Sequence, residues 1–219
     1  MSTPVFYYWD IRGLAQPVRL LLNYTGTQFE DCRLTMGPAP DYDKSNWTDI
    51  KFSLGLDFPN LPCYIDGDIK ITQSNAILRH IARKHDLVGK TEKEKAMVDM
   101  MADQSMDFRN GWVRLCYNAD FSNLKATYLK SLPETLQRFS EFLGSKKWFA
   151  GDSLTFVDFV MYELLDQHKL LSPNCLKEFE NLKSFTERFE ALPRIAAYMK
   201  SDKFKKGPLN NKMAKFGNV

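Results

Sequence analysis

The sequence contains no apolar run near the ~18 residues that a membrane-spanning helix needs, so we expect no such helix. Its first residues lack a basic region followed by an apolar core, so we expect no secretory signal and a cytoplasmic location. A net charge of +3 is too small to indicate nucleic-acid binding, and no predicted helix carries a stripe of lysine or arginine. We therefore expect neither a membrane nor a nucleic acid as a partner.

Cysteine and histidine are scarce, and their spacing excludes two further kinds of site. The sequence has no C-x-x-C motif, and its histidines add no metal-ligand pattern to the thiols. Scattered thiols without a secretory signal are typical of reduced, cytosolic cysteines. We therefore expect neither a disulfide nor a metal site. The residues concerned are Cys32, Cys63, Cys116, Cys175, His80, His85 and His168.

The chain of 219 residues is long enough for one large domain or two modest ones. Its opening stretch, "VFYYWDIRGLAQPVRLLL", predicts a strand over 4–9 and a helix from Leu14, because apolar spacing changes there from strand-like to helical. Pro17 is compatible with the first turn of that helix. Two tyrosines and a tryptophan thus end a strand where a helix begins, which is where ligands bind in open α/β sheets.

The first part of the chain alternates strand and helix patterns. A strand is predicted over 28–34, an irregular stretch over 36–47, a hairpin over 62–72 that turns at Asp66-Gly67, and a helix from Ser74. The polar stretch 85–94 is typical of a linker. All later patterns are helical, over 97–116, 124–143, 156–171 and 182–199. The fold class is therefore α/β plus all-α, with a thioredoxin-like domain at 1–84 and an all-helical domain at 91–219.

Three features of the helical part have structural interpretations. His168 lies on an apolar stripe and is predicted to be a core histidine. Thr155 and Asp158 match a capping box at the start of the helix, with Leu154 and Phe159 as its hydrophobic staple. Asp158 could instead be a catalytic acid, but capping needs no further assumption. The cluster Lys203, Lys205 and Lys206 is interpreted as a solvated tail.

The strand–helix junction lacks the cysteines that a redox protein of this layout would carry there. A thiol that reacts at this site must therefore come from outside the protein. A tyrosine hydroxyl can donate a hydrogen bond to such a thiolate, and a helix N-terminus adds partial positive charge. Both lower the pKa of the thiol. From the residues alone, Tyr7 and Tyr8 are equally compatible with this role or with packing in a strand.

Several stretches together resemble the mu class of cytosolic glutathione transferases. They are "YYWDIRGLAQPVRLLL", "MGPAPDYDKSNW", "GLDFPNLPCYIDG", "KITQSNAILRHIARKH", "LCYNADF", "SEFLGSKKWFAGDSLTFVDF" and "RFEALPRIAAYM". The resemblance covers nearly the whole chain. It implies a homodimeric enzyme that adds the thiolate of glutathione to hydrophobic electrophiles and uses no bound cofactor.

The resemblance also implies a glutathione site. Tyr8, which precedes Trp9, matches the catalytic tyrosine, and strand alternation directs Tyr7 to the opposite face. Asp107 matches an acid supplied by the partner subunit, although Asp99, Asp103 and Asp107 otherwise look like one solvated helix face. The implied glutathione-binding residues are Tyr8, Trp9, Leu14, Lys44, Trp47, Lys51, Asn60, Leu61, Pro62, Gln73, Ser74 and Asp107, with a cis peptide bond before Pro62.

The electrophile pocket and the dimer contact are implied in the same way. The matching pocket residues are Met106, Asn110, Val113, Tyr117 and Asn211, and Phe58 matches an aromatic key between subunits. Lys44 stands where an arginine is frequent and Asp10 where an asparagine is frequent, and the stretch 110–112 is less uniformly apolar than in many members. These departures concern the choice of electrophile.

Two functions are compatible with this pattern. The first is glutathione transfer to hydrophobic electrophiles. The alternative is a non-catalytic protein on the same fold that binds apolar ligands or has a structural role. Tyr8, Gln73, Ser74 and Asp107 favour the enzyme, because a protein without turnover has no chemical need for them. Retention on immobilised glutathione, followed by an assay with a dinitrohalobenzene, separates the two.

Overall fold

The opening aromatic run forms a central strand of a four-stranded sheet in the computed structural model, which describes residues 2–219. Strand β1 (Val5–Trp9) pairs in parallel with β2 (Glu30–Leu34) and antiparallel with β3 (Cys63–Asp66). Strand β4 (Ile69–Thr72) completes the order β2-β1-β3-β4. The predicted hairpin and thioredoxin-like domain are confirmed.

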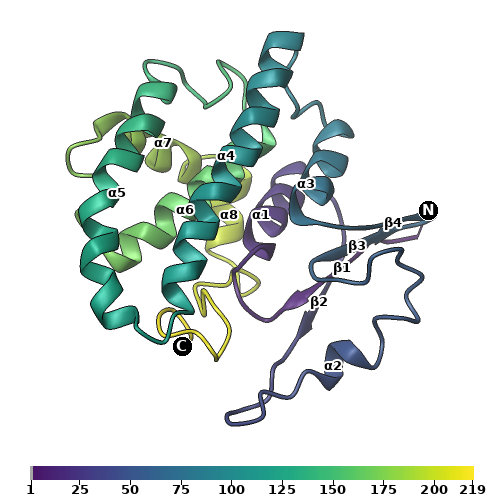
Figure 1. Cartoon of the computed structure of the whole chain (residues 1–219). Helices are drawn as coiled ribbons and strands as arrows, with labels where there is room; N and C mark the ends of the chain where they lie inside the picture. Colours follow the sequence, from purple (N-terminus) through teal and green to yellow (C-terminus); the bar gives the residue numbers. More distant parts are fainter. Residues whose placement is uncertain (1) are drawn as a thin grey trace.

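Two helices cover the face of this sheet that points to the rest of the protein (Figure 1). Helix α1 (Ala15–Thr25) follows β1 and ends at Gly26, whose φ of 74° lies in the left-handed region that glycine adopts without strain. Helix α3 (Ser74–Arg83) follows β4. The short helix α2 (Ser45–Thr48) lies apart from the helical domain, in the long connection between β2 and β3.

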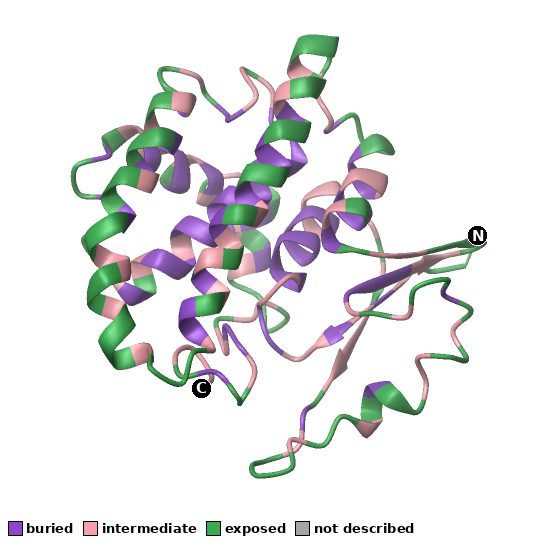
Figure 2. Ribbon diagram, in the orientation of Figure 1, coloured by how far each residue is buried: buried purple, intermediate pink, exposed green. Residues whose placement is uncertain are grey.

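The second domain is helical throughout, as the sequence predicts. Its helices are α4 (Glu92–Cys116), α5 (Phe121–Leu143), α6 (Phe156–Leu171), α7 (Glu180–Glu190) and α8 (Pro193–Met199). Helix α6 is buried along nearly its whole length, and the neighbouring helices are exposed on their outer faces (Figure 2). Because α1 packs against α6, one apolar core runs from the sheet through the helical domain.

The structural interpretations of Asp158 and His168 are confirmed. Asp158 is fully buried and accepts hydrogen bonds from the backbone N–H groups of Thr155 at 2.8 Å and Phe149 at 2.9 Å. His168 is fully buried and stacks on Phe108, with ring centroids 4.3 Å apart. Its Nε2 lies 2.7 Å from the Tyr128 hydroxyl. Burial lowers the pKa of His168 to about 4, so the ring is neutral at physiological pH.

Four expectations from the sequence need correction. The predicted helix over 182–199 is two helices, because Leu192 is extended (ψ 124°) before Pro193, as the proline ring demands. Helix α4 begins at Glu92, within the predicted linker, where Thr91 caps it by accepting the Glu94 N–H. Helix α2 begins inside the predicted irregular stretch 36–47, and the strand predicted over 28–34 begins only at residue 30.

The lysine cluster after α8 is solvated only in part, because Lys203 and Lys206 are exposed whereas Lys205 is half-buried. The Lys205 ammonium lies 2.7 Å from an Asp10 carboxylate oxygen, and the Lys206 carbonyl accepts a hydrogen bond from Arg12. This segment therefore packs across the turn that follows β1.

Some absences are established for residues 2–219. None of their helices is long and apolar enough to cross a membrane. No group of three or more metal-ligating side chains occurs among these described residues. All four cysteines are free thiols.

Candidate active site

Three strand ends meet at one edge of the sheet and bring the central predicted residues together. Tyr7 pairs with Cys63, and Cys63 pairs with Thr72, so the end of β1, the start of β3 and the end of β4 lie side by side. Tyr8 belongs to the first of these ends and Leu61-Pro62 to the second, through the cis peptide bond that the resemblance implied. Gln73 and Ser74 follow the third.

The structure distinguishes the two tyrosines that the residues alone left equivalent. Tyr8 is only 6% exposed, on the face that α1 covers, and its hydroxyl oxygen accepts the backbone N–H of Leu14 at 3.2 Å. Tyr7 lies on the opposite face, between Cys32 and Cys63. Burial, and secondarily these thiols, raise the pKa of Tyr7. Only Tyr8 is therefore placed at a helix start.

Gly13 explains how the chain passes so close to Tyr8. Its φ of 41° lies in the left-handed region, and a Cβ atom there would be only 2.8 Å from the Tyr8 hydroxyl oxygen. Any side chain at this position would displace the ring. The turn between β1 and α1 is thus built around the tyrosine.

Gln73 and Ser74 form the start of α3. Gln73 has φ 71° and ψ 114°, a strained conformation for a residue other than glycine, and such strain concentrates at functional sites. No side chain caps the helix, so its first N–H groups are available to an anion. Ser74 is buried at this N-terminus. A carboxylate would be stabilised there.

Three more of the residues predicted to bind glutathione contact a small apolar cluster that also contains Cys63. Trp47 is buried in this cluster, and Trp9 and Leu61 pack against both this cluster and the main core. Lys44 and Asn60 are exposed and Lys51 is half-buried. Their roles toward a ligand stay predictions.

The predicted electrophile residues are only partly brought together. Met106 and Leu14 line a narrow cavity of about 20 Å³ between the domains, which also reaches Ser74. Asn211 lines a separate cavity of about 180 Å³ with Ile11 and Met36.

Tyr117 connects to this second cavity, because its hydroxyl accepts the Asn211 N–H at 2.8 Å. Burial raises the pKa of Tyr117. Val113 packs in the same small cluster as Tyr117, whereas Asn110 is exposed. Trp112, next along the helix, is buried and belongs to the core.

Sequence reasoning missed Arg109, which lines the same cavity as Leu14 and Met106. Burial lowers the pKa of Arg109, while the Tyr8 and Tyr117 hydroxyls act in the opposite direction. Its guanidinium makes no ion pair within residues 2–219. The spacing of three residues from Met106 places both on one helix face, and this pattern could have identified it.

Two predicted residues lie away from Tyr8. Asp107 is exposed beside a groove of about 210 Å³ between α4 and α5. Its neighbours in the predicted acidic face, Asp99 and Asp103, lie 2.9 Å and 3.8 Å from Arg79 of α3. Phe58 is 79% exposed, so its own chain does not bury it.

Two family models match this chain. "Glutathione S-transferase, N-terminal domain" matches residues 4–83, and "Glutathione S-transferase, C-terminal domain" matches residues 106–202. The chain therefore belongs to the glutathione S-transferase family. Both ranges fall inside the predicted domains, whose own boundaries stay a prediction.

Individual relatives place it more narrowly, in the mu class of that family. The chain is 59% identical to glutathione S-transferase Mu 3 of Homo sapiens over 217 residues, which are 99% of this chain and 96% of that one. It is 60% identical to glutathione S-transferase Mu 5 of Mus musculus over 214 residues, 98% and 96% of the two chains. The structure of a Pi-class glutathione S-transferase of Onchocerca volvulus matches with a TM-score of 0.86 at 34% identity, covering 98% of this chain and 100% of that chain.

Proposed function

We propose that the protein transfers the thiolate of reduced glutathione to hydrophobic electrophiles, with Tyr8 as the catalytic residue. The observation that supports this most directly is the Tyr8 hydroxyl at the strand–helix junction, held by the N–H of Leu14, which lines one cavity together with Ser74 of α3. Membership of the glutathione S-transferase family agrees with it. The reaction needs no bound metal or cofactor, and glutathione is a co-substrate.

The geometry supports separate roles for Tyr8 and for the N-terminus of α3. The Leu14 N–H donates to the Tyr8 oxygen, so the hydroxyl proton is free to be donated to the glutathione sulfur. This hydrogen bond favours the thiolate, and the thiol proton leaves to solvent. The N-terminus of α3 receives the γ-glutamyl carboxylate of glutathione.

The thiolate then forms a C–S bond with the electrophile. In a substitution the leaving group departs with the bonding electron pair, and in an addition or epoxide opening the electrophile's oxygen or carbon takes up a proton. Leu14, Met106 and Val113 supply apolar surface for such a substrate. Tyr117 and Arg109 supply donors near its polar end.

The test compares Tyr8→Phe with Tyr7→Phe. Tyr8→Phe should lower kcat by ~10²-fold, the usual effect of losing one well-placed donor, and should raise the pKa of bound glutathione towards ~8.5. Tyr7→Phe should do neither, because its hydroxyl lies on the opposite face of the sheet. Ultraviolet absorbance of the bound thiolate against pH measures the pKa. Equal effects of the two changes would contradict the assignment.

We also propose a cytoplasmic homodimer. Phe58 is an aromatic side chain that its own chain leaves 79% exposed, and exposed aromatics of this kind anchor interfaces. The α4–α5 groove, with Phe108 and Leu132 buried beneath it, is the proposed receptor for the partner's aromatic. Asp107 borders this groove and would face the partner's glutathione.

A further inference from the structure

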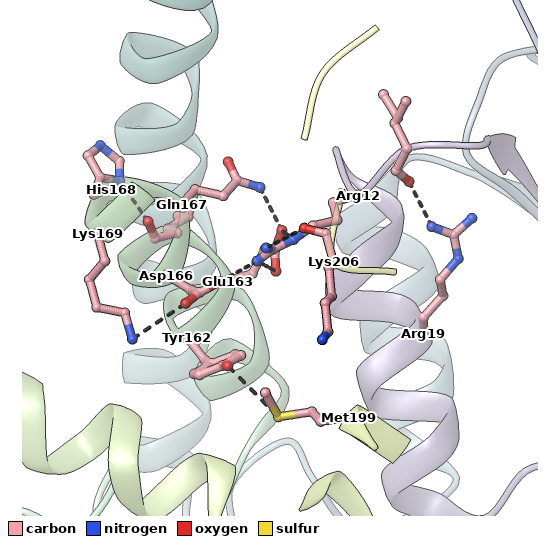
Figure 3. Close-up of polar contacts among 12 residues, drawn as sticks. Arg12, Arg19, Tyr162, Glu163, Asp166, Gln167, His168, Lys169, Met199 and Lys206 are labelled. Carbon is pink, nitrogen blue, oxygen red and sulfur yellow. Dashed lines mark hydrogen bonds and ion pairs between the residues drawn. The ribbon is translucent and has the colours of Figure 1, made fainter. Parts of the chain in front are cut away.

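A buried ion pair joins the turn after β1 to helix α6, far along the chain (Figure 3). The Arg12 guanidinium donates to both oxygens of Glu163, at 3.0 and 2.8 Å, and to Asp166 at 2.6 Å. The side chains of Arg12 and Glu163 are 4% and 2% exposed. Gln167 donates to Glu163 at 2.6 Å, so that carboxylate is held from two sides.

Such a pair is expensive to build. Taking two charges out of water costs several kcal/mol per ion, and a well-packed apolar pair is often as stable. Burial raises the pKa of Glu163, and the Arg12 charge opposes that rise. Burial lowers the pKa of Arg12, but the nearby carboxylates of Glu163 and Asp166 raise this pKa overall. Stability alone is therefore a weak reason for placing this pair between the domains.

The backbone of Arg12 leads from the ion pair to Tyr8. Its N–H donates to the Pro208 carbonyl at 2.8 Å, and its own carbonyl accepts from the first residues of α1. Gly13, the next residue, donates to the Leu209 carbonyl at 3.0 Å and passes against the Tyr8 ring. Leu14 then donates its N–H to the Tyr8 oxygen at 3.2 Å. One residue, Gly13, thus separates Arg12 from Leu14, whose N–H holds the tyrosine.

We propose that Glu163 is a positioning residue for catalysis: through its bidentate pair with Arg12 it holds the 12–14 turn so that the Leu14 N–H orients the Tyr8 hydroxyl toward the reacting thiol. Glu163 does not touch glutathione in this proposal. It acts from the helical domain on a hydroxyl of the other domain. The inference rests on the proposed role of Tyr8.

The main test is Glu163→Gln, which keeps the side-chain shape but removes the charge. The pKa of bound glutathione should rise by about 0.5–1, which corresponds to weakening one hydrogen bond near a charged group. The kcat should fall ~3–10-fold, and the KM for glutathione should change by less than ~2-fold, because the turn positions the hydroxyl and not the peptide.

The same change made in Tyr8→Phe protein separates positioning from other effects. If Glu163 acts through the Tyr8 hydroxyl, Glu163→Gln should leave the thiol pKa of Tyr8→Phe protein unchanged. A rise of equal size with and without the hydroxyl would mean a direct field or a general distortion, and it would overturn the proposal. If Tyr8→Phe itself leaves the thiol pKa unchanged, the proposed function of Tyr8 fails instead.

A matched control lies on the same helix. Asp158→Asn also converts a buried carboxylate of α6 to an amide, but its partners Phe149 and Thr155 are away from the 12–14 turn, so the thiol pKa should stay constant. If Glu163→Gln does not fold, Asp166→Asn decides, since Asp166 is 22% exposed and binds the same guanidinium. It should also raise the thiol pKa, by a smaller amount. An unchanged thiol pKa in either variant would refute the positioning role.

Discussion

Replacing Asp158 by alanine should destabilise the protein without touching the chemistry. The carboxylate accepts three hydrogen bonds, from the N–H groups of Phe149 and Thr155 and from the Thr155 hydroxyl at 3.1 Å. Asp158→Ala leaves two buried N–H groups without an acceptor, at ~1–3 kcal/mol each, so the free energy of unfolding should fall by about 2–6 kcal/mol. Loss of an ordinary cap alone would cost only ~0.5–2 kcal/mol.

The assay is urea unfolding followed by circular dichroism, at one fixed protein concentration because the proposed dimer would make stability depend on concentration. The midpoint should fall at unchanged m-value. Activity per folded molecule should stay near that of the wild type. A normal midpoint with lost activity would refute the capping argument and restore Asp158 as a candidate catalytic acid.

The ionisation of Asp158 makes the free energy of unfolding depend on pH. Burial raises its pKa to about 6, above the ~3.9 of an unfolded chain, so the folded state binds the proton more tightly. Its stabilising contribution is therefore complete below about pH 4 and is lost as the pH rises through 6, by about 3 kcal/mol in total. The stability difference between wild type and Asp158→Asn should fall by that amount between pH 4 and pH 7. A constant difference would contradict the shift.

Three further changes test other parts of the structure. Phe58→Ser should weaken the proposed dimer by ~2–4 kcal/mol, and sedimentation and glutathione titration over a dilution series should show dissociation together with loss of glutathione affinity. Arg109→Gln should lower kcat/KM about tenfold for electrophiles with a carbonyl or nitro group while the KM for glutathione stays within ~2-fold, as steady-state kinetics would show. The pKa of His168 is lowered to about 4, so its contribution to stability is complete above about pH 6.5 and is lost towards pH 4. Urea titrations of His168→Phe should lack this loss of about 3 kcal/mol.

Patterns that depend on near neighbours were predictable from the sequence. The hairpin, helix α6 and the Asp158 cap each depend on residues a few positions apart, so spacing and turn chemistry identified them. The break before Pro193 was also local, but helical apolar spacing continues across it and concealed it. Local structure of this kind can be predicted without knowing the rest of the fold.

Contacts between distant segments were not predictable in the same way. Arg12 and Glu163 are 151 residues apart, so no local sequence pattern links them. Lys205 was interpreted as solvated for the same reason, although it pairs with Asp10. The roles of Gln73 and Asp107 came from the family resemblance. For Gln73, the structure adds a strained backbone at the start of α3.

The crossing of the 205–211 segment over the turn after β1 has a consequence for synthesis on the ribosome. Domains generally fold as they emerge, N-terminal part first, so β1, α1 and the sheet can form early. The carbonyls of Pro208 and Leu209, which accept from Arg12 and Gly13, emerge almost two hundred residues later, as the separation of 194 residues between Arg12 and Lys206 illustrates. A nascent chain therefore carries a nearly complete sheet around an unfinished turn. The 12–14 turn can therefore acquire these two backbone acceptors only after the 205–211 segment has been synthesised.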